Sequence, residues 1–282
     1  MADSDIIEIK AKLWNGHINL RVVLAYKDQK VEYLCTIYRN SYITLKLPAI
    51  VEYFSAFVQG LSSKQLWFEY EGVPIKWNLP VGLLYDYLHL PSLLGNFESS
   101  SSWTVYLRYD DYPSDYIIPF IYKKDDGTVD FDRSLKEVIV NQLKQSCFVL
   151  NGNSKPIMSL SEANSIQLWV SIVDHNLSAY TSINKKIVPK DKAQKIPVRI
   201  FIPGTTTIVQ APIYPYGEEE PTSMRDVLSL HLPHLFAERE AIALPYIHGI
   251  DTQSLLDEPL LKTWEIFKHL DNFLYVVVIP RV

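Results

Sequence analysis

Cysteine is scarce in this chain, with two residues among 282. Cys35 and Cys147 each lie in an apolar-rich stretch, so a disulfide framework and a cysteine-rich zinc site are both excluded. Long apolar runs are also missing, because no stretch reaches the roughly 18 residues that a membrane-spanning helix needs. The N-terminal residues MADSDIIEIK are acidic where a secretory signal would be basic and then apolar. These absences predict a cytoplasmic protein with reduced, buried thiols.

An excess of positive charge is missing too. Lysine and arginine total 27 against 32 aspartates and glutamates, for a net charge of -5. The whole chain therefore has no attraction for nucleic acid, which we do not expect as a partner. With 48% hydrophobic and 21% charged residues, the composition is that of an ordinary globular protein, and the length suggests about two domains.

The C-terminal part of the chain has the element order of a small sheet domain. Residues 196–202 alternate apolar with other side chains, and 207–213 follow after a Pro-Gly turn, which predicts a hairpin. Thr222 or Ser223 can cap the helix that comes next, whose leucines form a mostly apolar face. Residues 244–249 then predict a short strand that ends in a glycine turn.

The last strand of this part, 273–279, is apolar on both faces. Such a strand needs cover on both sides, which suits the central parallel strand of a mixed sheet. Before it, 255–267 supplies apolar side chains that we expect to form irregular cover. The sequence ends at Arg281-Val282 without the glycine tail of a ubiquitin-like modifier. We therefore expect an acceptor or a binder, and not a donated modifier.

The same element order occurs earlier in the chain. Residues 18–26 and 31–38 form a predicted hairpin, and an amphipathic helical pattern follows at 47–58. Residues 66–70 run into a glycine turn, and 103–109 alternate as a closing strand. Strand, strand, helix, strand and final strand is the order of the ubiquitin-like, or β-grasp, fold, which occurs twice here.

Helical patterns occupy the rest of the chain. Apolar residues keep helical spacing over 135–150 and over 166–180, which predicts two helices that face a shared core. Ser159 with Glu162 is a potential capping box that would start the second of them. A short helix is expected at 4–13.

The predicted fold class is therefore α+β, with two ubiquitin-like domains flanking a helix-rich domain. The expected boundaries are 1–14 for the N-terminal helix, 15–122 for the first ubiquitin-like domain, 123–188 for the helix-rich domain and 189–282 for the second ubiquitin-like domain.

Two long motifs carry a resemblance to a known family. The stretch 66–86 reads LWFEYEGVPIKWNLPVGLLYD and 147–159 reads CFVLNGNSKPIMS. Together with DNFLY at 271–275, they resemble the autophagy-related protein 5 family, and the details are similar to a fungal member. The resemblance spans the whole chain.

That resemblance implies a non-catalytic scaffold of a ligase-like complex in autophagosome formation. Lys155 stands where the family has the lysine that forms an isopeptide bond with the ubiquitin-like autophagy-related protein 12. The resemblance further implies that the conjugate binds the N-terminal helix of the coiled-coil autophagy-related protein 16. That assembly promotes conjugation of autophagy-related protein 8 to phosphatidylethanolamine, so a lipid-conjugation enzyme is an indirect partner. Recruitment to the pre-autophagosomal membrane as a peripheral protein follows, and no cofactor is expected.

Lys155 is also a sensible acceptor from its own surroundings. Gly152 frees the backbone, and the adjacent asparagines and serine favour turns. Pro156 biases Lys155 toward an extended conformation, so we expect its amine to project from an exposed loop. A lysine amine is almost wholly protonated at neutral pH, so the conjugating enzyme must supply the deprotonation. The alternative is that Lys155 is one more solvated surface lysine.

Cys147 supports a different hypothesis, a cysteine-dependent transferase with His175 as a helper. A reactive thiolate needs an accessible, electropositive setting, whereas Cys147 shares an apolar stripe with leucines, which favours a core residue. His231 and His234 have a spacing compatible with one metal ion, but no further ligand is evident, so we expect no metal. A non-covalent ubiquitin-fold adaptor is a third reading.

Two surfaces are weaker candidates for binding. Trp77, Pro80 and Gly82 combine a large anchor with residues that shape a groove edge, where a partner helix could lie. The linker 185–195 carries five lysines against one aspartate and is a candidate for contact with an anionic membrane surface. The lysines of this linker are Lys185, Lys186, Lys190, Lys192 and Lys195.

Overall fold

The computed structural model of the chain describes residues 3–95, 102–189, 192–217, 220–237 and 241–281. Its contacts divide the chain into two compact units. The first unit is Asn15–Ile139, and the second unit combines Met1–Trp14 with Val140–Val282.

The sheet of the first unit has the order β2-β1-β5-β3-β4, in which β1 and β5 are parallel and the other neighbours antiparallel. Strand β5 alternates buried and half-buried residues, which is the pattern of a strand with one face on a core. Helix α2 supplies that core with Leu47, Ile50, Val51 and Phe54. The elements are β1 (His17–Tyr26), β2 (Gln29–Tyr38), η1 (Ile43–Lys46), α2 (Leu47–Phe54), η2 (Leu61–Ser63), β3 (Trp67–Tyr70), β4 (Val73–Pro74), α3 (Val81–Leu88), α4 (Leu90–Gly95) and β5 (Trp103–Arg108).

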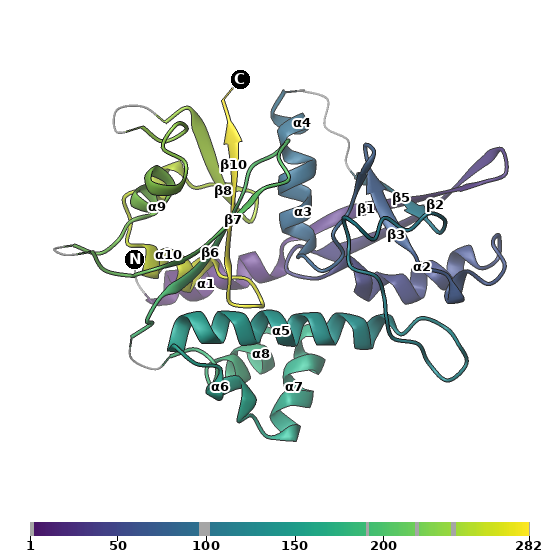
Figure 1. Cartoon of the computed structure of the whole chain (residues 1–282), viewed down its shortest axis with the longest axis horizontal. Helices are drawn as coiled ribbons and strands as arrows, with labels where there is room; N and C mark the ends of the chain where they lie inside the picture. The colour runs from purple at the N-terminus through teal and green to yellow at the C-terminus, as the bar shows by residue number, and fades with distance from the viewer. Residues whose placement is uncertain (1–2, 96–101, 190–191, 218–219, 238–240, 282) are drawn as a thin grey trace. The chain divides into compact units, whose positions relative to one another are not determined.

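The sheet of the second unit repeats this topology as β7-β6-β10-β8-β9 (Figure 1). Strand β10 runs parallel to β6 and antiparallel to β8, and every residue from Leu274 to Ile279 is buried. The predicted central parallel strand is therefore confirmed. The elements are β6 (Ile196–Phe201), β7 (Ile208–Ile213), α9 (Met224–His231), β8 (Ala243–Ile247), β9 (Ile250–Asp251), η3 (Gln253–Leu255), α10 (Leu260–Phe267) and β10 (Leu274–Pro280).

Two helices of the second unit cover its sheet. Ser223 caps α9 in a capping box with Asp226, so one of the two predicted cap residues is confirmed. The apolar cover expected at 255–267 to be irregular is instead a regular helix from Leu260 onward, α10, which buries Leu260, Trp264 and Phe267. A helix fits because these three residues recur with helical spacing and thus share one face.

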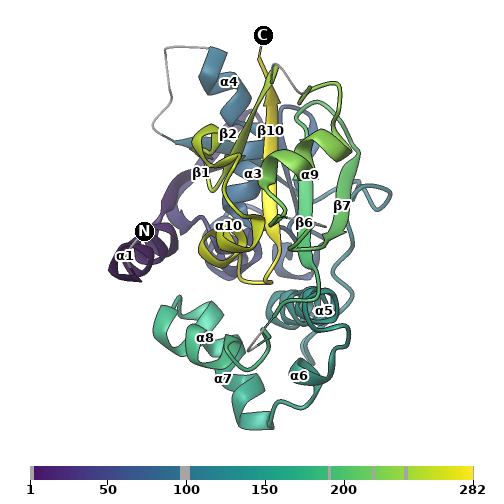
Figure 2. The same cartoon turned by 90° about the vertical axis from the view of Figure 1, so that its left-hand side faces the viewer.

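Helix α5 (Phe131–Asn151) begins in the first unit and ends in the second. Within the second unit it is followed by α6 (Lys155–Met158), α7 (Glu162–Val173) and α8 (Leu177–Asn184), and both views show these three on one side of α5 (Figures 1 and 2). Helix α1 (Asp3–Asn15) packs Ile6, Ile9 and Leu13 against the core of the second unit.

The prediction of one helix over 166–180 was wrong. Asp174 ends α7, His175 adopts a positive φ of 53°, and the Asn176 side chain caps α8 by accepting from Ala179 N at 3.0 Å. The cap of α7 is also not Ser159 but Ser161, whose hydroxyl accepts from Asn164 N. An asparagine that bonds the backbone two or three residues on competes with a continuous helix, so the chain turns at this point.

Polar contacts join the helices of the second unit to its sheet. The side chains of Asn184 in α8 and Asn272 before β10 exchange two hydrogen bonds of 2.8 Å, and the Tyr180 hydroxyl donates to Leu270 O at 2.7 Å. Both asparagines are buried. A buried amide is costly to leave unpaired, so separating α8 from the segment before β10 would break these bonds at a cost in free energy. The bonds therefore hold the helices and the second ubiquitin-like fold together as one structural unit.

None of the helices in the described part of the chain is long and apolar enough to cross a membrane.

Candidate functional site

A buried thiol lies one turn before the loop that joins α5 to α6. Cys147 lies on α5 with no exposed surface, between Leu143 and Leu150, which are equally buried. Its Sγ lies 3.7 Å from Asn153 O and 3.8 Å from Ile187 O, both of which can accept from the thiol. Burial raises the pKa of this thiol. Cys147 is therefore in the core, as expected, and links the end of α5 to the loop.

Asparagine side chains hold the loop itself. Asn151 Nδ2 donates to Cys147 O and to Ile187 O, each at 3.0 Å. Asn153 Nδ2 donates to Asn151 O at 3.1 Å, while Asn153 Oδ1 accepts from Lys155 N at 3.0 Å. Between them Gly152 has a φ of +70°, a conformation that side chains other than glycine rarely adopt. The loop is thus held by specific bonds on both sides of the glycine.

Lys155 is exposed, as predicted, but its backbone is not extended. It is the first residue of the four-residue helix α6, and Ser159 N donates back to Lys155 O at 2.9 Å. Pro156 takes the second helical position, where its missing N–H leaves no bond unmade. The expectation of an extended conformation was wrong because the Asn153 bond and this helical turn together outweigh the bias that proline places on its predecessor.

Large apolar side chains are exposed on α5, α6 and α7. Met158 at the end of α6 and Phe148 on α5 are more than half exposed. On α7, Ile166, Val170 and Val173 form an exposed stripe, although their spacing had predicted a core face. The core side of α7 is instead Leu168, Ser171 and Ile172.

The lysine-rich linker follows α8. Lys186 Nζ donates to Asn164 Oδ1 at 3.0 Å, and Lys195 Nζ lies 4.5 Å from the centre of the Tyr214 ring, a cation–π distance. Lys192 Nζ lies 5.8 Å from the centre of the Tyr216 ring. Both tyrosines are more than half exposed. Lys185 is exposed as the C-cap of α8, whereas Lys190 lies outside the described residues.

The residues predicted to shape a partner groove lie in the interior of the first unit. Trp77 is 2% exposed, stacks on Phe120 with ring centres 4.4 Å apart, and donates its indole N–H to Ile118 O at 2.8 Å. Pro80 is buried. A Cβ on Gly82 would lie 2.8 Å from Arg39 Cβ, so the glycine permits close packing of α3. The tryptophan ring is therefore committed to the core, and a partner groove at these residues stays a prediction.

The histidines considered for catalysis or metal binding are His175, His231 and His234. The His175 ring donates from Nε2 to Trp14 O at 2.7 Å, and burial lowers its pKa. The Trp14 indole in turn donates to His175 O at 2.9 Å, so this pair docks α1 on the turn before α8. His231 ends α9 and His234 follows it. Among the described residues, no group of three or more histidines, cysteines, aspartates or glutamates is arranged to hold a metal ion.

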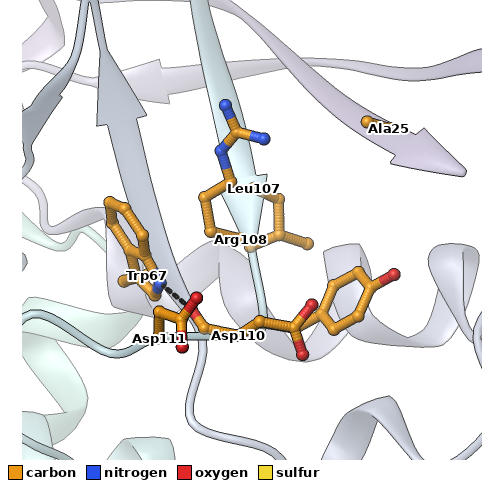
Figure 3. Close-up of a pocket in the computed structure, with 7 residues that line it drawn as sticks. Ala25, Trp67, Leu107, Arg108, Asp110 and Asp111 are labelled. Atoms are coloured by element: carbon orange, nitrogen blue, oxygen red, sulfur yellow. Dashed lines mark hydrogen bonds between the residues drawn. The ribbon is translucent and has the colours of Figure 1, made fainter.

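A hollow of about 300 Å³ lies at the end of β5 in the first unit (Figure 3). Its polar groups bond largely to each other and to neighbouring side chains. Trp67 Nε1 donates to Asp110 O at 2.9 Å, and Arg108 pairs with Glu69 at 3.0 Å. We assign it no ligand and take the loop at Lys155 as the candidate site.

Comparison with family models covers most of the chain. Residues 13–109 match the model described as "Autophagy protein ATG5, UblA domain", 132–190 match "Autophagy protein ATG5, alpha-helical bundle region", and 195–278 match "Autophagy protein ATG5, UblB domain". These matches and the two sheets confirm the predicted fold class of two ubiquitin-like domains flanking a helix-rich region.

Curated relatives are similar over nearly the full length. "Autophagy protein 5" of Debaryomyces hansenii is 52% identical over 285 residues, with 99% of this chain and 97% of the relative covered. "Autophagy protein 5" of Candida albicans is 47% identical, with 99% of both chains covered. The crystal structure of Kluyveromyces marxianus Atg5 is 28% identical, has a TM-score of 0.79, and covers 96% of this chain and 99% of its own.

Proposed function

This chain belongs to the autophagy protein 5 family and so acts in autophagy, and within that role we propose that it is a non-catalytic scaffold conjugated through Lys155. The modifier is the ubiquitin-like autophagy-related protein 12. The observation that carries the proposal is the exposed lysine at the start of α6, directly after a loop that is held by hydrogen bonds on both sides. Such a loop offers an accessible amine on a backbone of defined conformation.

The proposed reaction is an aminolysis. The Lys155 amine attacks the thioester carbonyl that joins the modifier's C-terminus to a cysteine of the conjugating enzyme. A bond forms between Nζ and the carbonyl carbon, the carbon–sulfur bond breaks, and the thiolate leaves. The amine loses one proton to the enzyme or to water, and an isopeptide remains. The chain needs to supply position for this reaction and no redox chemistry.

The buried state of Cys147 weighs against the transferase alternative. A thioester-forming cysteine must be reached by its partner, and Cys147 has no exposed surface while burial raises its pKa. The chain's own contribution to the reaction is then the acceptor amine.

The rest of the proposal follows from the family. The conjugate binds the N-terminal helix of autophagy-related protein 16 and, as a ligase-like complex, promotes the transfer of autophagy-related protein 8 to phosphatidylethanolamine. In this proposal the protein acts at the pre-autophagosomal membrane as a peripheral component. The lysines of the linker, with Tyr214 and Tyr216 beside two of them, are a surface that could face anionic lipid.

The test is reconstituted conjugation with Lys155→Arg. We expect no conjugate, with an unchanged unfolding midpoint, because the side chain is exposed and arginine keeps the charge. Lys144→Arg, an exposed lysine on α5, is the matched control and should conjugate normally. Peptide mapping should locate the branched isopeptide at Lys155. Conjugate that persists in Lys155→Arg would refute the acceptor role, and a chain that is never modified in autophagic cells would favour a non-covalent adaptor.

A further inference from the structure

Asn153 uses both ends of its side-chain amide inside the acceptor loop. Oδ1 accepts from the backbone N–H of Lys155 at 3.0 Å, and Nδ2 donates to Asn151 O at 3.1 Å. The first of these bonds is an Asx turn, in which the side chain bonds the backbone two residues on. It reaches the residue that bears the acceptor amine, and the second bond fixes the side chain that makes it.

The next bonds run from this amide toward the core. The Asn153 carbonyl lies 3.7 Å from Cys147 Sγ, and Asn151 Nδ2 donates to two backbone carbonyls, Cys147 O and Ile187 O. Cys147 and Ile187 have no exposed surface. The loop is therefore fixed at a buried point on α5, while Asn153 and Lys155 themselves are exposed.

The linker after α8 closes the other side of the loop. Gln194 N donates to Leu150 O at 2.8 Å, and a Cβ placed on Gly152 would lie 2.8 Å from Gln194 Cδ. The linker backbone is thus bonded to the end of α5, and the Gln194 side chain lies against Gly152.

We propose that Asn153 is the positioning residue for the acceptor amine: through its bond to the Lys155 N–H, it holds that backbone where the amine meets the thioester. The inference rests on the proposed function, since it concerns the same lysine. The physical reason is that displacement of a reacting group by about 1 Å can cost up to a hundredfold in rate, even when binding is unchanged. Asn153 touches neither the amine nor the thioester, so its effect is on the rate of transfer.

The experiment measures single-turnover transfer from the thioester-charged conjugating enzyme to the full chain over a range of chain concentrations. Asn153→Ala should lower the maximal rate constant about tenfold and leave the half-saturating concentration unchanged. Asn153→Ser should recover part of the rate, because a serine hydroxyl can accept the same backbone N–H more weakly. Discharge of the enzyme to free lysine in solution should be the same in all samples.

Asn176→Ala is the control, because the Asn176 side chain also accepts from a backbone N–H at 3.0 Å, there three residues on, to cap α8. It should lower the free energy of unfolding by about 1 kcal/mol, as the loss of a helix cap does, and conjugate at the wild-type rate. A wild-type rate for Asn153→Ala, or an equal loss in both variants, would overturn the inference. Lys155→Arg in the same assay separates the two claims: if it still conjugates, the proposed function fails, and if only Asn153→Ala behaves as wild type, the positioning role fails alone.

Discussion

The positive charge of Lys268 lowers the stability of the folded protein. This residue is the C-cap of α10, and its Nζ lies 4.1 Å from the centre of the Trp264 ring. Burial and the nearby charge of Lys10 lower its pKa to about 8, against a smaller opposing effect of Glu265. We therefore predict that Lys268→Met increases the free energy of unfolding at neutral pH.

The magnitude follows from the difference between the folded and unfolded pKa values. In the unfolded chain the lysine titrates at its ordinary 10.5, and in the folded chain at about 8. At about 1.36 kcal/mol per pH unit, the difference is worth about 3 kcal/mol. The ring of Trp264 favours the ammonium by about 1 kcal/mol, so about 2 kcal/mol is the expected gain.

The sign of the pH dependence is fixed by the lowered folded pKa. Between about pH 8 and 10.5 the unfolded chain binds more protons at this site than the folded chain, so the wild type gains stability as the pH rises through that range. Below pH 8 Lys268 is protonated in both the folded and the unfolded chain, so its charge destabilises the folded state to the full extent. The advantage of Lys268→Met should thus be constant below pH 8 and shrink toward pH 10.5.

Urea denaturation of the wild type and Lys268→Met at pH 7 and pH 9.5 measures this difference, and the comparison cancels the titration of other groups. Lys262→Met is the matched control on the same helix. Lys262 pairs with Glu258 at 2.6 Å on the surface, and such a pair contributes little, so the effect of Lys262→Met on the free energy of unfolding should be small. Equal stability of Lys268→Met and wild type at pH 7, or a difference that does not change with pH, would refute the reasoning.

Two further predictions concern surfaces of the second unit. Ile166→Asp on α7 should lower the free energy of unfolding by less than about 0.5 kcal/mol, because the Ile166 side chain is half exposed. Leu168→Asp should lower it by about 3 kcal/mol or more, because the Leu168 side chain is buried. Similar costs for the two variants in thermal or urea unfolding would show that the buried face of α7 is assigned wrongly. Glutamine at four lysines of the linker should weaken flotation with anionic vesicles by up to about 4 kcal/mol, at about 1 kcal/mol per lysine, and leave neutral vesicles unaffected. The four are Lys185, Lys186, Lys192 and Lys195. Retention of anionic vesicles at the wild-type level would remove the linker from the proposal.

The sheets were predictable because their strands carry the signal in their own residues. The run that became β10 is apolar on both faces, and only a central position covers both. Strand β5 alternates, and it packs one face on a core. The strand order follows from these two observations once the hairpins are recognised, since a short turn leaves few ways to pair the remaining strands.

The helical region was less predictable because apolar spacing identifies a stripe but not what covers it. Ile166, Val170 and Val173 lie on one stripe of α7 as expected, yet that stripe is exposed and Leu168 and Ile172 face the core. The helix break at His175 was missed for a related reason. One local signal is Asn176, which caps α8, but a helix cap resembles any other polar residue until the turn before it is known.

The loop at Lys155 shows how far local rules reach at a functional site. Turn-forming residues and Gly152 correctly predicted an exposed lysine, and Pro156 wrongly predicted an extended backbone. The bonds that decide the conformation come from Asn153 nearby and from Ile187, more than thirty positions along the chain. A local preference of proline is weak against a helical turn that begins on an Asx bond. The presentation of the acceptor amine is therefore a property of the folded second unit, and a peptide of the same sequence should lack it.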